Sequence, residues 1–201
     1  MNETPVPRRA VEDEIARLEQ MSKRGESYAD ASGRFGWRNP IRADTGPLLQ
    51  ELVGARDPQR MLEVGTAHGL SGLHLLSGLS SWEGRRLDTI ELHEAVGQAA
   101  QARFRRLGAP AEVHIGEAMD VIAKQLDQPY DLVFLDAQKS HYADQCSLLH
   151  ARGLMGSGTL LLADNVVDRA AECATFFAWL EGAGLSFEIR PTECGLLVTT
   201  L

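Results

Sequence analysis

The chain has 201 residues, with 20 basic and 28 acidic side chains and a formal net charge of −8. This length predicts a single domain with one buried core, and no apolar run approaches the roughly 20 residues of a membrane-spanning helix. The acidic balance argues against a nucleic-acid partner, and three cysteines without a C-x-x-C pair indicate neither a zinc site nor a disulfide framework, so a cytoplasmic protein is expected.

The N-terminal part is expected to be one helix followed by a polar connection. Val11, Ile15 and Leu18 recur at helical spacing among charged residues after Pro7, which predicts an amphipathic helix over 7–24. A glycine-rich and polar stretch follows at 25–39. The expected division is therefore an N-terminal helix with its connecting segment, residues 1–40, and a main domain, residues 41–201.

Apolar runs and helical patterns alternate along the main domain. Strands are predicted at 61–64, 87–91, 112–115, 132–135 and 159–163, and helices near 69–79, 93–107, 117–127, 140–152 and 168–182. This alternation predicts a parallel sheet joined by crossover helices. The last two strands, 185–190 and 196–200, lie too close together for a parallel crossover and should form an antiparallel hairpin. The expected fold class is α/β, with a seven-stranded, mostly parallel sheet and helices on both faces.

The densest group of basic residues in the main domain lies in the helix predicted at 93–107. Arg103, Arg105 and Arg106 form this group. We expect it to be a solvated helix face, because charge runs on helices usually face water.

A glycine-bracketed loop follows the first predicted strand. The sequence L-E-V-G-T-A-H-G-L-S, residues 62–71, places Glu63 before Gly65 and Gly69. Such a turn exposes backbone N–H groups at the C-terminal edge of a sheet, where open α/β proteins hold nucleotide-like ligands. Dinucleotide-binding loops have the spacing G-x-G-x-x-G, so the spacing E-x-G-x-x-x-G disfavours a nicotinamide dehydrogenase and favours a cationic ligand. Glu91 ends the second strand, where a carboxylate can bind a ribose diol.

Polar side chains also follow the fourth and fifth predicted strands. Asp136 comes directly after one strand, and Asp164 and Asn165 after the other. Together these oxygen donors suit Mg²⁺ or Ca²⁺ better than zinc. Lys139 lies about one helical turn beyond Asp136 and is a candidate base for a hydroxyl at the same site. Each residue alone has an ordinary alternative: the Asp-Asn pair caps a helix, Lys139 is a surface residue, and Tyr142, one turn further, packs in the core.

At these motifs the sequence resembles the catechol and caffeoyl-CoA O-methyltransferase family of class I S-adenosylmethionine-dependent methyltransferases. L-E-V-G-T-A-H-G-L-S is similar to the family's motif for the methionine part of the cofactor, and T-I-E-L to its ribose strand. F-L-D-A-Q-K-S-H-Y and A-D-N-V are similar to its metal and base motifs. The resemblance runs from about Ile41 to the C-terminus and implies a Rossmann-like methyltransferase domain.

The resemblance implies a role for each matching residue. Asp136, Asp164 and Asn165 would bind the divalent cation, and Lys139, with Asp136 beside it, would carry the catalysis. The implied cofactor-binding residues are Glu63, Gly65, Ala67, Gly69 and Ser71 at the methionine end, Glu91 at the ribose, Glu117 and Ala118 at the adenine, together with Asp136 and Ile41, the latter within the segment 40–46 that closes over the cofactor.

Three features depart from the family pattern. Gln138 stands where relatives often have an aspartate or an aromatic residue, and His68 occupies a variable position for which a local hydrogen-bonding role is expected. Relatives usually carry a longer segment after D-N-V, whereas residues 166–169 here are expected to run almost directly into the next helix.

The expected function is metal-assisted transfer of a methyl group from S-adenosylmethionine to a hydroxyl of a catechol-like or other small aromatic diol. Mg²⁺ is the first expectation for the metal, with Ca²⁺ and Mn²⁺ as alternatives. The expected partner is a small-molecule acceptor, without a membrane or nucleic acid, and a homodimer is left open. A methyltransferase for an amine or a larger acceptor and a non-catalytic cofactor-binding protein are the alternatives.

Overall fold

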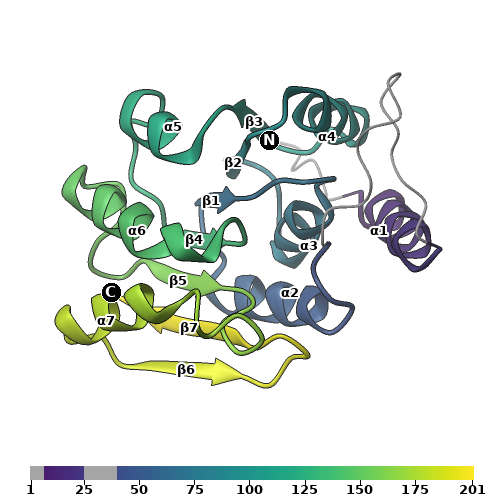
Figure 1. Ribbon diagram of the computed structural model, residues 1–201. Helices are drawn as coiled ribbons and strands as arrows, with labels where there is room; N and C mark the ends of the chain where they lie inside the picture. Colours follow the sequence, from purple (N-terminus) through teal and green to yellow (C-terminus); the bar gives the residue numbers. More distant parts are fainter. Residues whose placement is uncertain (1–6, 25–39) are drawn as a thin grey trace.

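The computed structural model describes residues 7–24 and 40–201, which form an α/β fold around one seven-stranded sheet (Figure 1). The strand order is β3-β2-β1-β4-β5-β7-β6. β7 pairs antiparallel with both β5 and β6, whereas the other pairs are parallel. The strands are β1 (Arg60–Val64), β2 (Arg86–Glu91), β3 (Ala111–Ile115), β4 (Leu132–Leu135), β5 (Leu160–Ala163), β6 (Phe187–Arg190) and β7 (Leu196–Thr200).

Helices cover both faces of the sheet (Figure 1). One buried cluster joins the sheet to α1 (Arg8–Lys23), α2 (Thr45–Arg56), α3 (Leu70–Gly78) and α4 (Glu94–Leu107), and the other joins it to α5 (Ala118–Lys124), α6 (Tyr142–Ala151) and α7 (Ala174–Gly182). Successive strand residues alternate between these clusters, because side chains on a strand point to opposite faces. Met61 and Phe134 lie in the first, and Leu62 and Leu135 in the second.

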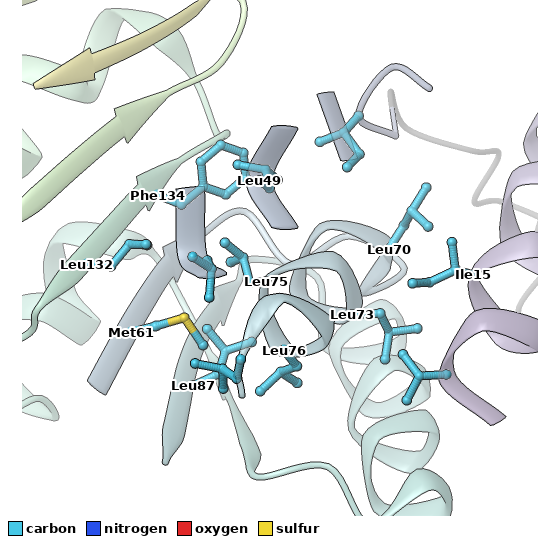
Figure 2. Packing of buried hydrophobic residues seen from close by; sticks show 14 of the residues in the cluster. Ile15, Leu49, Met61, Leu70, Leu73, Leu75, Leu76, Leu87, Leu132 and Phe134 are labelled. Carbon is cyan, nitrogen blue, oxygen red and sulfur yellow. The ribbon is translucent and has the colours of Figure 1, made fainter. Parts of the chain in front are cut away.

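Helix α1 packs on the main domain through the apolar stripe predicted from its sequence. Val11, Ile15 and Leu18 are buried in the first cluster. Figure 2 shows Ile15 beside Leu70 and Leu73 of α3. Because burying each aliphatic side chain contributes about 1.5–3 kcal/mol, this stripe favours packing of the helix on α3.

The fold class predicted from the sequence is confirmed: the sheet is seven-stranded and mostly parallel, with an antiparallel C-terminal pair. The periodicity did not predict α2, because two of its buried positions are Thr45 and Gly46, which carry no apolar signal. Gly46 lies so close to His74 that an added Cβ would overlap its ring. The polar stretch at 25–39 lies outside the described residues, so the predicted boundary near residue 40 stays a prediction.

The helix predicted at 168–182 begins later, at Ala174. Residues 166–173 form turns instead. The backbone N–H groups of Val166 and Val167 donate to the carbonyl oxygens of Gly195 and Cys194 at 3.2 and 3.0 Å, which holds this segment against the β6–β7 connection and delays the helix. The expectation that residues 166–169 run almost directly into a helix was therefore wrong.

Within the described part of the chain, none of the helices has the length and apolar character needed to cross a membrane. The three cysteines are free and buried.

Candidate cofactor and metal site

The candidate residues lie at one edge of the sheet, where four parallel strands end. In sheet order β2-β1-β4-β5, these strands lead into Glu91, Gly65, Asp136 and Asp164. Val64 pairs with Leu135, and Leu135 with Ala163, so the residues that follow are neighbours across the strands. The Asp136 N–H donates to the Val64 carbonyl at 2.9 Å, and the Asp164 N–H to the Leu135 carbonyl at 3.0 Å. This pairing of β1, β4 and β5 thus places the glycine loop, Asp136 and Asp164 next to one another in sheet order.

The glycine loop, residues 65–69, has a conformation that its glycines make accessible. Gly65 has φ +109°, and a Cβ there would collide with the carbonyl oxygen of Asp136. Gly69 has φ +77°, and a Cβ there would lie 2.9 Å from the Phe104 ring. Both positions require glycine, because left-handed backbone and close approach leave no room for a side chain. Ala67 has φ +44°, an unusual value for a residue with a side chain, so the surroundings must hold the loop in place.

Glu91 makes one of the contacts that keep the glycine loop in this conformation. Its Oε2 accepts the Ala67 N–H at 2.8 Å and its Oε1 accepts the His93 N–H at 2.9 Å. The carboxylate is therefore fixed against the loop, and each oxygen keeps a further lone pair with which to accept a ligand hydroxyl.

Glu63 lies fully buried beneath the loop. Its Oε2 accepts the Thr89 hydroxyl at 2.5 Å, whereas no hydrogen-bond partner for Oε1 is present among residues 7–24 and 40–201. Burial raises the pKa of Glu63 to about 8, the charges of Asp136 and Glu91 raise it further, and hydrogen bonds from Ser71 and Thr89 oppose the shift. A buried acid with an unused oxygen is suited to a cationic or hydrogen-bond-donating ligand.

The acidic pair Asp136 and Asp164 forms the second half of the site. Asp164 is 1% exposed, and its Oδ1 has no hydrogen-bond partner within the described part of the chain. Burial and the charge of Asp136 raise the pKa of Asp164 to about 7. Burial also raises the pKa of Asp136, against the opposing effect of Lys139. Two repelling carboxylates with an unsatisfied buried oxygen fit a hard divalent cation, which would relieve both penalties.

Asn165 and Asp168 lie on the segment that follows Asp164. Asn165 has φ +65°, a left-handed conformation that asparagine tolerates better than most residues, and its own N–H hydrogen-bonds to Asp164. Asp168 is exposed, yet its negative charge contributes to raising the pKa of both Asp136 and Asp164. The sequence patterns did not point to Asp168; its position three residues after Asn165 was the available signal.

Lys139 lies in a short 3₁₀ turn, Lys139–His141, rather than in an α-helix. Its Nζ donates to Oδ1 of Asp136 at 2.9 Å and lies 5.6 Å from the centre of the Tyr142 ring. Tyr142 itself is buried in the core, where its hydroxyl donates to the Leu135 carbonyl at 2.9 Å and contacts the Asp164 carbonyl at 3.3 Å. Tyr142 therefore fixes the strand ends beneath the acidic pair, as the packing alternative predicts.

Comparison with known proteins agrees with this arrangement. A family model described as a methyltransferase domain matches residues 62–166, just over half of the chain. The chain is 31% identical over 137 residues to catechol O-methyltransferase B of Danio rerio and 32% identical over 132 residues to catechol O-methyltransferase of Mycobacterium tuberculosis; each match covers 65% of this chain. The chain belongs to this methyltransferase family.

This family member spans only part of those relatives, 51% of the Danio rerio protein and 58% of the mycobacterial one. Its fold matches most of a solved structure: an O-methyltransferase from Bacillus cereus in complex with SAH superposes with a TM-score of 0.75 at 22% identity, covering 96% of this chain and 90% of that one.

In this member of the methyltransferase family, the remaining predicted site residues lie around the strand ends. Ser71 lies in the first turn of α3, and Glu117 precedes α5, where its side chain accepts the Asp120 N–H at 3.1 Å. Ala118 begins α5 at the same edge, since the Gly116 N–H donates to the Glu91 carbonyl at 2.9 Å. The side chain of Ile41 is buried in the first apolar cluster.

His68 is buried in the loop, where burial lowers its pKa to about 4, so its imidazole is neutral at physiological pH. Gln138 is exposed. The prediction of a solvated arginine face was wrong for Arg103, which is 3% exposed and ion-paired with Glu14 of α1, although Arg105 and Arg106 are exposed. Helical spacing alone could not show that a helix from the N-terminus covers this position.

A second group of possible metal ligands, Asp88, Glu112 and His114, lies on the adjacent strands β2 and β3. Arg86 pairs with both Asp88 and Glu112, and the Tyr130 hydroxyl donates to Asp88 at 3.1 Å. Although burial alone would raise it, hydrogen bonds from His114 and Arg86 lower the pKa of Asp88 to about 2. These contacts already balance the charge of Asp88, whereas Oδ1 of Asp164 has no partner in the described part of the chain.

Proposed function

We propose that this protein transfers a methyl group from S-adenosylmethionine to a hydroxyl of a small aromatic diol, with help from a divalent cation. The observation that carries the proposal is the adjacency of two unsatisfied acidic sites along one sheet edge. Glu63 and the glycine loop lie at β1, and Asp136 and Asp164 lie at the next two strands. Cofactor and acceptor would therefore meet between β1 and β5.

The cofactor would lie across the glycine loop. Glu63, with Gly65, Ala67, Gly69 and Ser71 above it, would hold the methionine end, and Glu91 would accept the ribose hydroxyls. Glu117 and Ala118, at the start of α5 beyond β3, would contact the adenine. The segment 40–46, which contains Ile41, would close one side of the cofactor site.

The metal donors would be Asp136, Asp164 and Asn165. Mg²⁺ is the proposed ion, with Ca²⁺ and Mn²⁺ as alternatives, because the donors are oxygen atoms. Such an ion, when bound, orients adjacent acceptor hydroxyls and makes them more acidic. Asp136 and Asp164 would hold the acceptor end of the site at a fixed distance from the loop.

Lys139 would accept the proton of the attacking hydroxyl. In the structure its ammonium donates to Asp136, so it must release its own proton and leave that contact before it can act as a base. S-adenosylmethionine would supply an activated methyl group, and the carbon–sulfur electron pair would stay on sulfur as the acceptor oxygen takes the methyl carbon. The sulfonium already activates the methyl group, so alignment of the two reactants is the main task of the protein.

The family supports this assignment. The relatives named above are catechol O-methyltransferases, and the Bacillus cereus structure holds SAH, the demethylated cofactor. The protein would act on a small-molecule acceptor, and the buried free cysteines are compatible with a cytoplasmic location. The division into residues 1–40 and a methyltransferase domain over 41–201, and a homodimeric state, remain proposals.

The direct test incubates the purified protein with methyl-labelled S-adenosylmethionine and a panel of catechols, caffeates and simple phenols, with Mg²⁺ or with EDTA. Mass spectrometry should detect monomethylated diols with Mg²⁺ and much less product with EDTA. Lys139→Ala and Asp164→Ala should lose turnover while keeping most cofactor affinity, whereas Asp144→Ala, an exposed acid on α6, should match the wild type. Cofactor binding without any methylated diol in the presence of Mg²⁺, Mn²⁺ or Ca²⁺ would contradict the proposed acceptor.

The exposed Asp168 favours one variation on this function. A third carboxylate whose charge reaches the acidic pair would attract an acceptor that carries an amine as well as a hydroxyl. Measuring KM for an amine-bearing catechol and for caffeate distinguishes an enzyme that recognises the amine from one that recognises the diol alone. Asp168→Asn should raise the KM for the amine alone if the carboxylate recognises it.

A further inference from the structure

Arg103 connects the N-terminal helix to the glycine loop. Its Nη1 donates to the carbonyl oxygen of His68 at 2.6 Å, and its Nε donates to Oε1 of Glu14 at 2.8 Å. The guanidinium therefore lies between α1, where Glu14 is found, and the loop over which the cofactor is proposed to bind. A planar guanidinium with two fixed partners is a rigid link, because its donors have a fixed fork geometry.

Glu14 is the charged centre of this link. Arg17 donates to its two oxygens at 2.6 and 3.0 Å, and Arg106 approaches Oε1 at 2.9 Å, in addition to Arg103. Although burial alone would raise it, hydrogen bonds from Arg17 and Arg103 lower the pKa of Glu14 to about 2. The carboxylate is therefore ionised across the pH range in which the protein would work, and it holds Arg103 in one position.

The glycine loop needs contacts that fix its conformation, because its backbone is strained. Ala67 has φ +44°, and Glu91 holds its N–H. Arg103 holds the next residue through the His68 carbonyl, and Phe104 fills the space beneath Gly69. The two neighbouring residues of α4 thus support the part of the loop that Glu91 does not reach.

We propose that Glu14 and Arg103 are positioning residues that preset the glycine loop, so that docking of α1 and binding of the cofactor stabilise one another. This inference rests on the proposed function, since it assumes that the loop binds S-adenosylmethionine. A loop held in its binding conformation before the ligand arrives binds more tightly, because less order has to be imposed on binding. Neither residue needs to touch the cofactor for this effect.

The test measures the Kd of S-adenosylmethionine by calorimetry for the wild type and for Glu14→Gln, which keeps the shape of the side chain and removes its charge. Kd should rise about tenfold, while kcat at saturating cofactor stays near the wild-type value. Glu14→Asp, which keeps the charge, should recover part of the affinity. Glu12→Gln, at an exposed position on the same helix, should not change Kd.

A second control separates positioning from general stability. Val11→Ala removes an apolar contact of the same helix and leaves Glu14 and Arg103 in place. Below the melting transition it should leave Kd nearly unchanged, and hydrogen exchange at residues 65–69 should speed up in Glu14→Gln and not in Val11→Ala. A wild-type Kd in folded Glu14→Gln, or equal weakening by both substitutions, would overturn the proposal. A wild-type protein that binds no cofactor contradicts the proposed function instead, and the exchange rates then still decide whether Glu14 orders the loop.

Discussion

At the scale of single residues, the site is defined by acidic groups that the folded chain leaves only partly satisfied. Glu63 and Asp164 each have a buried oxygen for which the described residues provide no partner, and both have a raised pKa. Buried polar groups are almost always hydrogen-bonded, so these two carboxylate oxygens, at the ends of β1 and β5 with β4 between them, are suited to contact ligands. Their substitution should therefore affect stability and binding in opposite directions.

Asp164→Asn should stabilise the metal-free protein at alkaline pH and abolish its response to Mg²⁺. The folded-state pKa of Asp164, about 7, lies above the ordinary value of 3.8, so this group favours folding below pH 4 and that contribution is lost as the pH rises through 7. At pH 8 the variant should gain roughly 1–3 kcal/mol in the free energy of unfolding. Urea melts at pH 4 and pH 8 with EDTA measure this. An equal gain at both values would show that ionisation of Asp164 is not the cause.

Glu63→Gln tests the cofactor half of the site. The pKa of Glu63 is raised to about 8, so its contribution to stability is also present at low pH and is lost above the ordinary 4.5 and through 8. The amide resembles the protonated acid, so the variant should fold normally at pH 6 and bind S-adenosylmethionine about tenfold more weakly if a carboxylate is needed for the cationic ligand. Calorimetry at pH 6 and 8.5 measures Kd, with exposed Asp120→Asn as the control. Unchanged affinity at both pH values would remove Glu63 from the cofactor site.

At the scale of helices and strands, the site depends on how α6 fastens the ends of β4 and β5. The Tyr142 hydroxyl donates to the Leu135 carbonyl and contacts that of Asp164. Tyr142→Phe should cost about 1–2 kcal/mol in the free energy of unfolding, because it leaves buried carbonyl oxygens without that donor. It should also weaken Mg²⁺ binding. Tyr130→Phe is the matched control: its hydroxyl donates to Asp88 near the opposite edge of the sheet, so it should cost similar stability and leave Mg²⁺ affinity unchanged.

The ends of the strands are features of the site that the sequence could predict. Strand ends were accessible, because an apolar run that stops at Asp136 or Asp164 fixes both the strand and the edge at which its carboxylate emerges. The relation of the glycine loop to Glu91 followed from the order of the first two strands. These features depend on local pattern and on the rule that parallel strands end at one edge.

Features set by distant contacts could not be predicted. Arg103 is buried because Glu14, 89 positions earlier in the chain, covers it, and no window around Arg103 contains that information. The start of α7 at Ala174 depends on backbone hydrogen bonds from Val166 and Val167 to the β6–β7 connection. Asp168 acts on the acidic pair through its charge, from the turns that precede α7. In each case the deciding partner belongs to another element.

At the scale of the whole molecule, ligand binding should stabilise the entire fold. Glu91 ends β2, and Gly65, Asp136 and Asp164 directly follow β1, β4 and β5; each of these four adjacent strands lies between the two apolar clusters. A ligand that holds these four strand ends together is lost on unfolding of the sheet, so its binding free energy adds to the stability of the folded state. At one hundred times its Kd the cofactor should contribute about 2.7 kcal/mol. For a domain of this size that corresponds to a rise in Tm of roughly 5–10 °C.

Thermal melts with S-adenosylmethionine, Mg²⁺, both, or EDTA provide the measurement. Mg²⁺ alone should raise Tm, because neutralising Asp136 and Asp164 removes their repulsion. The rise with Mg²⁺ should disappear in Asp164→Asn, whereas the rise with cofactor should persist, since Glu63, Glu91 and the glycine loop are intact. If Mg²⁺ raised the Tm of Asp164→Asn as much as that of the wild type, the ion would be binding elsewhere, and the acidic pair would lose its assignment as the metal site.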